Sequence, residues 1–315
     1  MSTTEIEPFR QGRFEDLPDA PRRPHVYFRT RAEELDMESL PFGRLRVHFR
    51  VHGEGPPLLL VHGLMTTSYS WRYVLPELGR RYTLYVPDLP GAGRSGKPLE
   101  PSYHPDAMAD WIGEFQRAVG IRGCLAIGNS MGGYLCMRLA LRDPGAMSRL
   151  VNVHSPGVPE PRLLALRVAF AIPGSRRLLL ALVHRDPLRW AHRNVHYWDE
   201  SLKSLEEARE YGGALADRTG CLAFGKFLSE TLAAGPMKTF HRELLARRRD
   251  GLAFPIPLLL LYARRDPMVP ARFGDVFAER IPSARLVRID EASHFAHVDG
   301  VERFLPPVLE FLTAS

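Results

Sequence analysis

The sequence predicts an α/β protein with a mostly parallel central sheet, helices on both faces of the sheet, and an inserted helical cap. Short apolar runs alternate with helical stretches through most of the chain, as they do when helices connect parallel strands. About a hundred residues of mostly helical pattern interrupt this alternation between positions 153 and 258. In addition, a serine between two glycines directly follows one of the predicted strands.

The predicted strands come from two kinds of pattern. Residues 45–51 alternate apolar and polar side chains, and the turn 53–55 separates them from the continuous apolar run 58–61. Further apolar runs predict buried strands at 83–86, 124–127, 150–153, 258–262 and 285–289. Helical stretches lie near 70–79, 105–119, 131–142, 271–280 and 301–312. Catalytic residues of such a sheet are expected beyond the carboxyl ends of its strands.

These patterns divide the chain into three regions. Residues 1–40 are predicted to form an irregular N-terminal arm without chemistry, because four prolines interrupt it and no apolar period is sustained. Residues 41–156 and 251–315 form the predicted α/β core domain. Residues 157–250 form the predicted helical cap, which acts as a lid.

Composition excludes several classes of protein. A chain of 315 residues with 45% hydrophobic and 25% charged residues can bury a large core, which excludes disorder. Residues 1–40 lack the apolar stretch of a signal peptide, and the most apolar region, 163–183, is broken by proline, glycine and arginine. We therefore expect a cytoplasmic protein without stable membrane insertion. The cysteines have no metal-type spacing and predict reduced thiols: Cys124, Cys136 and Cys221.

The net charge of +6 does not indicate a nucleic-acid partner. Residues 157–250 carry 16 basic side chains, but 11 acidic ones interleave with them and no nucleic-acid motif accompanies them. The arginine run 247–249 could recognise a carboxylate or a phosphate, although a charged surface is the simpler interpretation. We expect a small-molecule partner and a monomer or homodimer.

The candidate nucleophile is Ser130. It lies in a G-x-S-x-G pattern between the strand 124–127 and the helix 131–142, where a sharp turn lifts the hydroxyl above the sheet. Only glycine at 128 and 132 leaves room for the crossing backbone, and the turn is expected to be strained. The helix N-terminus favours a developing anion.

A serine hydroxyl needs a base, and that base needs an orienting carboxylate. Asp266 follows the strand 258–262 in a loop that two prolines restrain, and His294 follows the last strand, 285–289. The order serine, aspartate, histidine fits a sheet of this kind. His297 is the rival base, and it makes an H-x-x-H pair with His294 that is too little to predict a metal site.

Backbone amides supply the predicted oxyanion hole. Residues 62–65 follow the strand 58–61, where the amide of Leu64 can face the serine turn together with the amide of Met131. His62 is interpreted as a brace for this loop rather than a catalyst. His154 and Ser155 stand at another strand exit and could line the pocket.

One motif suggests a nucleotide but fails on context. Residues 91–96 match G-x-G-x-x-G, and Lys97 nearly completes a phosphate-binding loop. Pro98 stands where a serine or threonine would bind magnesium, and no helix begins directly behind the glycines. We interpret the segment as a turn that closes under the serine loop, and no cofactor or metal is expected.

In combination, these motifs resemble the α/β-hydrolase superfamily over about residues 40–315. The matching pieces include His62-Gly63 with Trp71 nine residues on, the run 88–95 and the serine turn, and the family's triad carries onto Ser130, Asp266 and His294. Haloalkane dehalogenases and epoxide hydrolases of this fold have an aspartate where Ser130 stands, so the resemblance argues against both activities. The turn also resembles that of meta-cleavage-product hydrolases, which cleave carbon–carbon bonds, although the glycine-rich oxyanion loop usual there is absent.

The predicted function is that of a serine hydrolase, a carboxylesterase-like enzyme. It would cleave a small to medium, largely apolar carboxylic ester or related carbonyl compound through an acyl-enzyme intermediate. The apolar side chains of the predicted cap support this substrate class, because a lid turns part of such a surface toward the substrate. They include Leu163, Leu166, Phe170, Leu178, Leu182, Trp190, Tyr197, Trp198 and residues near 222–228. The alternatives are a carbon–carbon bond hydrolase of the meta-cleavage-product type and a non-catalytic ligand receptor on the same fold.

Overall fold

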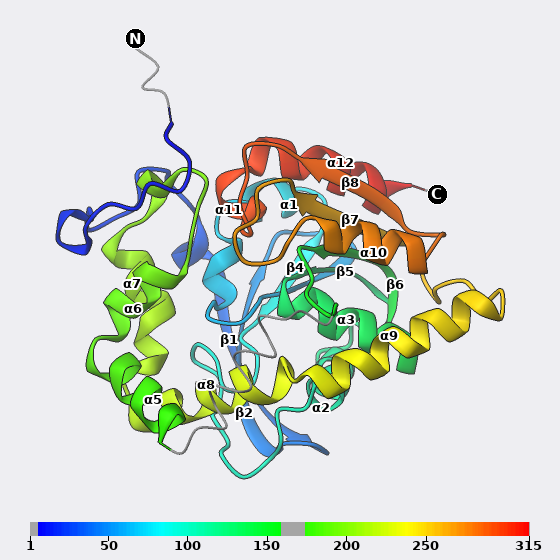
Figure 1. Ribbon diagram of the computed structural model, residues 1–315, viewed down its shortest axis with the longest axis horizontal. Helices are drawn as coiled ribbons and strands as arrows, with labels where there is room; N and C mark the ends of the chain where they lie inside the picture. Colours follow the sequence, from blue (N-terminus) through cyan, green and yellow to red (C-terminus); the bar gives the residue numbers. More distant parts are fainter. Residues whose placement is uncertain (1–5, 159–173, 315) are drawn as a thin grey trace.

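The protein has an eight-stranded sheet with helices packed on both of its faces (Figure 1). The computed structural model describes residues 6–158 and 174–314. The strands, in chain order, are β1 (Arg31–Ser39), β2 (Gly43–His52), β3 (Pro57–Val61), β4 (Thr83–Pro87), β5 (Cys124–Asn129), β6 (Met147–Val153), β7 (Leu258–Ala263) and β8 (Arg285–Ile289).

The sheet is mostly parallel, as predicted. Its strand order is β1-β2-β4-β3-β5-β6-β7-β8, and every neighbouring pair from β4 to β8 is parallel. β2 pairs antiparallel with both β1 and β4. All the strands predicted from apolar runs are present, with bounds that differ by at most a few residues. The predicted fold class is therefore confirmed.

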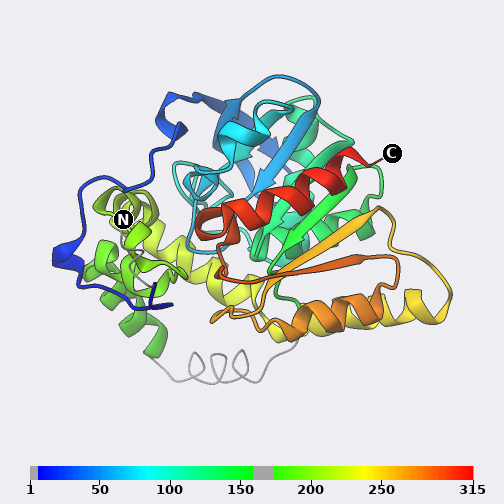
Figure 2. The same ribbon diagram turned by 90° about the horizontal axis from the view of Figure 1, so that it is seen from above.

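The helices that cover one face of the sheet come from the middle of the chain, and those that cover the other face come from nearer its two ends. Those of the α/β core are α1 (Leu75–Leu78), α2 (Pro105–Ala118), α3 (Met131–Arg142), α10 (Arg272–Arg280), α11 (Ala296–Asp299) and α12 (Val301–Thr313). α2, α3 and α10 contribute to one apolar cluster, and α1 and α12 contribute to another. Figure 2 shows α12, in red, and α10, in orange, on opposite sides of β7 and β8.

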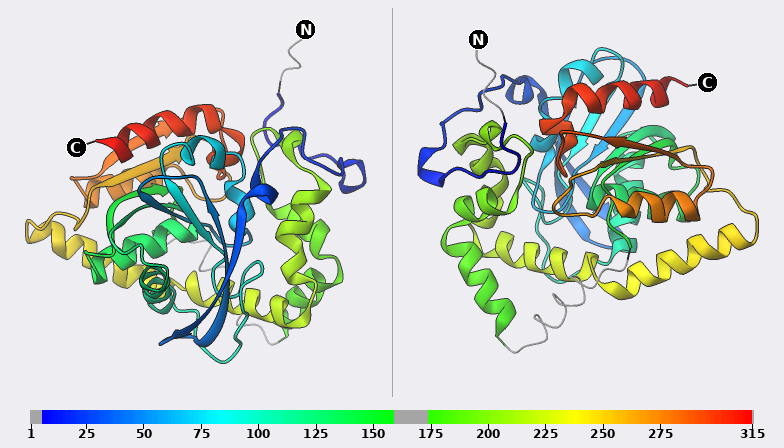
Figure 3. Two further views of the ribbon diagram at one scale, coloured as in Figure 1. Left: turned by 180° about the vertical axis from the view of Figure 1, so that it is seen from behind. Right: turned by 45° about the horizontal axis from the view of Figure 1, so that its top comes forward.

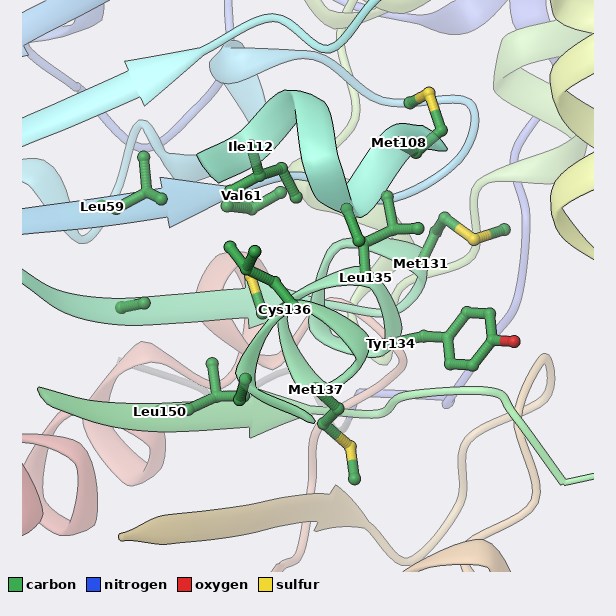
Figure 4. Close-up of a cluster of buried hydrophobic side chains, with 14 of the residues drawn as sticks. Leu59, Val61, Met108, Ile112, Met131, Tyr134, Leu135, Cys136, Met137 and Leu150 are labelled. Carbon is green, nitrogen blue, oxygen red and sulfur yellow. The ribbon is translucent and has the colours of Figure 1, made fainter. Parts of the chain in front are cut away.

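The side chains of strand β3 alternate between the two faces of the sheet. Leu59 and Val61 belong to the cluster beneath α2 and α3, whereas Leu58 and Leu60 belong to the cluster beneath α1 and α12. All four side chains are completely buried, because successive side chains of a strand point to opposite faces and both faces are covered here. Figure 4 shows the first of these clusters, in which side chains of α2 and α3 meet those of β3 and β6.

The N-terminal arm predicted for residues 1–40 is wrong over residues 31–39. These residues form β1, which pairs with β2 through a hairpin whose long strands are visible in Figure 3. β1 is the edge of the sheet, and only Met37 and Ser39 of its residues are buried. An edge strand in contact with water carries many charged residues and leaves little apolar pattern in the sequence, which explains the error.

The helix predicted near 70–79 is shorter in the structure. A 3-10 turn occupies Ser68–Trp71, and α1 then begins afresh at Leu75. Pro76 lies in the first turn of α1, where its missing N–H costs no hydrogen bond, but it could not have continued a helix from residue 72. The segment therefore forms two short turns instead of one helix.

Helices also fill the described part of the chain between β6 and β7. They are α5 (Ser175–Arg185), α6 (Pro187–Asn194), α7 (Leu205–Gly212), α8 (Arg218–Thr231) and α9 (Ala234–Arg249). All five fall within the predicted cap region, and we call α5 to α8 the cap helices. Figure 1 shows them grouped at one side of the sheet, with α9 returning from them toward β7.

The cap helices have a small apolar cluster of their own. Trp190 packs edge-on against Phe224 within it, and Tyr197 is completely buried against the core. Leu178 and Leu182, two of the apolar side chains of the predicted cap, are 63% and 55% exposed. They lie on the outer side of α5. The spacing of apolar residues alone does not show which side of a helix other elements will cover. Three other apolar residues of the predicted cap, Leu163, Leu166 and Phe170, lie outside the described residues.

Three further expectations concern membrane insertion, the cysteines and the arginine run 247–249. None of the helices in the described ranges has the length and apolar composition needed to cross a bilayer. Cys124, Cys136 and Cys221 are all buried free thiols, and burial raises the pKa of Cys124 to about 11. In the arginine run at the end of α9, Arg248 pairs with Glu279 and Arg249 with Asp250, as on an ordinary charged surface.

Replacing Leu60 by alanine should test the two-sided burial of the sheet. We expect Leu60→Ala to lower the free energy of unfolding by about 2–5 kcal/mol, because it leaves a cavity in a strand covered on both faces. Leu40→Ala is the control, since Leu40 is 96% exposed and its loss should cost under about 0.5 kcal/mol. Urea denaturation of both variants measures this difference, and equal costs would contradict it.

Candidate active site

Ser130 occupies a strained turn between β5 and α3. Its backbone has φ 52° and ψ −120°, in a region that side chains other than glycine rarely adopt. Its amide donates to the carbonyl oxygen of Val153 at 2.7 Å, which ties the turn to the end of β6. The predicted sharp, strained turn is therefore confirmed.

The flanking glycines are required by close backbone contacts. A Cβ atom at Gly132 would overlap the carbonyl oxygen of Val61 at the end of β3. A Cβ atom at Gly128 would lie 2.6 Å from the Cα atom of Gly133. Side chains at these two positions would push α3 away from the sheet, so the sequence argument for both glycines is confirmed.

Asp266 and His294 meet as a buried pair. His294 Nδ1 lies 2.7 Å from Asp266 Oδ2, and both side chains are almost completely buried. The other carboxylate oxygen, Oδ1, accepts from the amides of Met268 and Val269 at 2.7 and 2.9 Å. Burial by itself would raise the pKa of Asp266, but His294 and the hydrogen bonds outweigh it and hold that pKa below its ordinary value. The ionised carboxylate therefore holds the hydrogen on His294 Nδ1.

Ser130 and His294 border the same cavity. It encloses about 150 Å³. Its other described lining residues are nearly all apolar: Leu64, Met65, Met131, Pro156, Leu232, Met268, Val269, Pro270 and Phe273. The structure thus brings the predicted nucleophile and base to one apolar cavity, with the predicted acid directly behind the base.

The loop after β3 lies against the serine turn. A Cβ atom at Gly63 would come within 3.0 Å of the Ser130 Cβ atom, and Leu64 borders the cavity together with Met131. His62 braces this loop, because its Nε2 accepts from the Leu89 amide at 2.9 Å and its Nδ1 donates to the Gly63 oxygen at 2.7 Å. The bracing interpretation of His62 is confirmed, and the amides of Leu64 and Met131 remain the predicted oxyanion donors.

The rival base and the nucleotide motif have other surroundings. His297 is completely buried, packs against Trp71 with 4.3 Å between the centroids of the two tilted rings, and is not part of the cavity lining. In the turn after β4, the Asp88 carboxylate accepts from the amides of Ser68 and Arg94 at 2.7 and 2.9 Å. Because the chain's own carboxylate binds the Arg94 amide of this motif, the segment fits the predicted turn rather than a phosphate site.

His154 and Ser155, which the sequence left as possible lining residues, do not line the cavity. Ser155 Oγ donates to the carbonyl oxygen of Ser130 at 3.3 Å, and His154 is completely buried beside the Asp266–His294 pair. A strand-exit position indicates that a residue is near the site, but it does not show whether the side chain points into the cavity or beneath it.

Asp299 is a residue of the site that the sequence did not reveal. Its carboxylate accepts from the amide of Ser293, next to His294, at 3.1 Å and from the amide of Trp198 at 2.6 Å. It therefore joins the loop that carries His294 to the segment between α6 and α7. Burial raises the pKa of Asp299 to about 7, although these hydrogen bonds oppose the rise. In the sequence, nothing about an aspartate in a short helix indicates that its carboxylate binds the amide of a residue 101 positions away.

Comparisons with known proteins agree with this fold. Residues 56–301 match the family model described as alpha/beta hydrolase fold. The chain belongs to this family. The 2-hydroxymuconate semialdehyde hydrolase of Pseudomonas sp. (strain CF600) is 27% identical over 292 residues, which are 90% of this chain and 95% of that protein.

Two further similar proteins are esterases by name. Pimeloyl-(acyl-carrier protein) methyl ester esterase of Aeromonas hydrophila is 27% identical over 276 residues, 82% of this chain and 96% of that protein. The solved structure of a thermophilic esterase from Thermogutta terrifontis has a TM-score of 0.69 and 22% identity, and the match covers 90% of this chain and 98% of that one. The chain is thus an alpha/beta hydrolase fold protein with hydrolases among its relatives.

The buried carboxyl of Asp299 should make stability depend on pH. Its folded-state pKa of about 7 lies above the ordinary value of 3.8, so the unfolded chain releases this proton first as pH rises. We therefore expect this contribution to stability to be complete below about pH 4 and to be lost progressively up to about pH 7, by roughly 4 kcal/mol. Urea unfolding between pH 4 and pH 8 measures the loss.

Asp299→Asn supplies the control for that measurement. An amide cannot release the proton, but its oxygen can still accept from one of the two backbone amides. The variant is expected to be less stable than the parent at pH 4 and to show a flatter dependence between pH 4 and pH 7. Parallel pH curves for the two proteins would rule out Asp299 as the source.

Proposed function

We propose that this protein is a serine hydrolase that cleaves a small, largely apolar carboxylic ester or a related carbonyl compound. The observation that carries the proposal is the cavity that both Ser130 and His294 border, with the buried Asp266 carboxylate 2.7 Å from Nδ1 of the imidazole. A hydroxyl, an imidazole and a carboxylate in this order are the parts that nucleophilic acyl transfer requires.

In the proposed reaction, Ser130 Oγ attacks the ester carbonyl while His294 Nε2 takes the hydroxyl proton. The amides of Leu64 and Met131 stabilise the oxyanion that forms, and Asp266 stabilises the imidazolium. The proton then passes to the departing alkoxide, which leaves as the alcohol, and the acyl group remains on Ser130. Water attacks this acyl-enzyme, gives a proton to His294, and releases the acid as Ser130 regains its proton.

The walls of the cavity support the proposed substrate class. Apart from His294, its described lining residues carry no ionisable side chain, so a charged group on the substrate would be desolvated there without a partner. A cavity of about 150 Å³ suits a small acyl group. Leu232, just beyond α8, is the residue that the described cap region contributes to the lining, which fits the expectation of an apolar lid.

Carbon–carbon bond cleavage is the second candidate. It is favoured by the similarity to the 2-hydroxymuconate semialdehyde hydrolase, which extends over 90% of this chain. The name of that relative's substrate denotes a carboxylate, and no cation lies among the described residues that line this cavity. The uncharged lining therefore supports the ester proposal over this one.

A fluorophosphonate probe and a panel of p-nitrophenyl esters test the proposal. The parent protein should be labelled at Ser130 and should hydrolyse short acyl esters. Ser130→Ala should lose labelling and at least about a thousandfold of kcat while its unfolding curve stays close to the parent's, because it removes the nucleophile. Mass spectrometry of the labelled peptide and stopped assays measure these outcomes.

Each contrary result has a definite meaning in this test. A folded parent protein that the probe does not label and that binds esters without turnover would favour the receptor alternative. Turnover of a vinylogous 1,5-diketone acid with no turnover of the esters would favour carbon–carbon cleavage. Labelling at a residue other than Ser130 would overturn the assignment of the nucleophile.

Phe273 should limit the length of the acyl group. It lies in the first turn of α10, is 3% exposed and borders the cavity. Phe273→Ala should therefore raise kcat/KM for longer acyl esters relative to acetate by about tenfold. Phe277→Ala is the matched control, because Phe277 is a buried phenylalanine of the same helix that does not line the cavity. An equal change of preference in both variants would contradict the assignment.

A further inference from the structure

His154 is a buried histidine that the proposed reaction does not use. It directly follows β6, and its backbone has a φ of 50°, which is uncommon for a residue with a side chain. Its amide donates to the carbonyl oxygen of Leu261 at 3.0 Å, which fastens this unusual turn to β7. The ring is completely buried, and its centroid lies 5.5 Å from that of His294.

The hydrogen bond of the ring determines its tautomer. His154 Nε2 accepts from the amide of Ala263 at 2.5 Å, so this nitrogen carries no hydrogen and the neutral ring has its hydrogen on Nδ1. Ala263 ends β7, three residues before Asp266. Burial lowers the pKa of His154 to about 3, although the charge of Asp266 opposes this, so the ring stays neutral near pH 7.

The ring also lies beside the reacting pair itself. One ring nitrogen of His154, one carboxylate oxygen of Asp266 and one ring nitrogen of His294 all lie within 4.8 Å of one another. Within the described ranges, His154 Nδ1 is buried and makes no hydrogen bond of normal geometry, although the backbone of His294 lies near enough to the ring to oppose the fall in its pKa. The Nδ1–H group is an oriented dipole in a site with little water, where such a dipole acts strongly on a nearby charge.

We propose that His154 is a positioning residue for the Asp266–His294 pair. Its Nε2 holds the strand end that carries Asp266, and its neutral ring presents an N–H dipole beside the carboxylate without competing for the hydrogen bond to His294. This inference rests on the proposed function, since it assigns His154 a role in activating Ser130.

Other residue types at this position would act differently. A lysine would offer a full positive charge and attract Asp266 away from His294, whereas a carboxylate would place a second negative charge beside the first. A phenylalanine would fill the space but would supply neither the acceptor for Ala263 nor the dipole. The neutral histidine thus combines the acceptor with a donor that does not compete for the base.

Other titratable groups face His154 from neighbouring elements. They are Asp266 after β7, His294 after β8, Tyr262 within β7 and His297 in α11. Burial drives the pKa of His297 well below and that of Tyr262 well above their ordinary values, so both are neutral near pH 7. Asp266 is therefore the charged group that the His154 dipole influences.

His154→Phe and His154→Gln separate the two contributions. Glutamine can keep an acceptor for the Ala263 amide but lacks the Nδ1 hydrogen, whereas phenylalanine loses both. We expect His154→Phe to lower kcat for a p-nitrophenyl ester by about 10- to 100-fold with KM changed less than about threefold. The acid limb of its pH–rate profile should move to higher pH, because Asp266 is then protonated more easily. His154→Gln should recover part of kcat.

Tyr262→Phe is the matched control for a general loss of packing. Tyr262 is a completely buried neighbour whose hydroxyl donates to the carbonyl oxygen of Ser155 at 2.9 Å. This variant should lose stability but keep kcat within about threefold and keep the pH profile. An equal loss of kcat in Tyr262→Phe, or unchanged kcat and pH profile in a folded His154→Phe, would overturn the proposal.

Two substrate-independent measurements distinguish this inference from the proposed function. The rate of fluorophosphonate labelling reports the nucleophilicity of Ser130: an unlabelled parent refutes the proposed function, whereas equal rates in the parent and His154→Phe refute the role of His154. The downfield proton resonance of His294 Nδ1–H reports the pair without any reaction. It should shift upfield or broaden in His154→Phe, and an unchanged resonance would also count against the proposal.

Discussion

The close approach of α3 to the end of β3 is the constraint on which the rest of the site depends. Gly132 lies so near the carbonyl oxygen of Val61 that no side chain fits between them. This contact keeps Ser130 in a strained backbone conformation at the start of α3. The strain persists because both sides of the turn belong to rigid elements: the Ser130 amide is bonded to β6, and α3 is buried between α2 and the sheet.

Buried polar contacts position the loops around this turn. His62 joins the loop after β3 to the loop after β4, where the Asp88 carboxylate binds two further amides. Asp299 joins the loop of His294 to the segment that follows α6. Each of these groups pairs with at least one backbone amide that lies 20 or more residues away in the chain. Leaving such buried groups unpaired would cost about 1–3 kcal/mol. Loops without regular structure are thereby held in place around the cavity.

The cap helices and the core share an apolar boundary close to the site. Leu64 and Met65 pack against the small apolar cluster of α5 and α8, although they belong to the loop beside Ser130. A change in the packing of the cap helices would therefore reach the predicted oxyanion loop directly. The same loop meets a polar brace on one side, His62, and apolar cover on the other, which suits a site that excludes water.

The sequence by itself determined the sheet, its helices and the turn at Ser130, because apolar runs and glycine spacing are local consequences of how a strand or a turn is built. It also predicted that Asp266 and His294 follow neighbouring strands, and parallel pairing of β7 with β8 brings them to one edge. Only the tertiary structure decided that 31–39 is an edge strand, that His154 lies beneath the pair rather than in the cavity, and that Asp299 reaches Trp198. Those features depend on contacts between distant segments and on the direction of a side chain, which no local pattern of residues encodes.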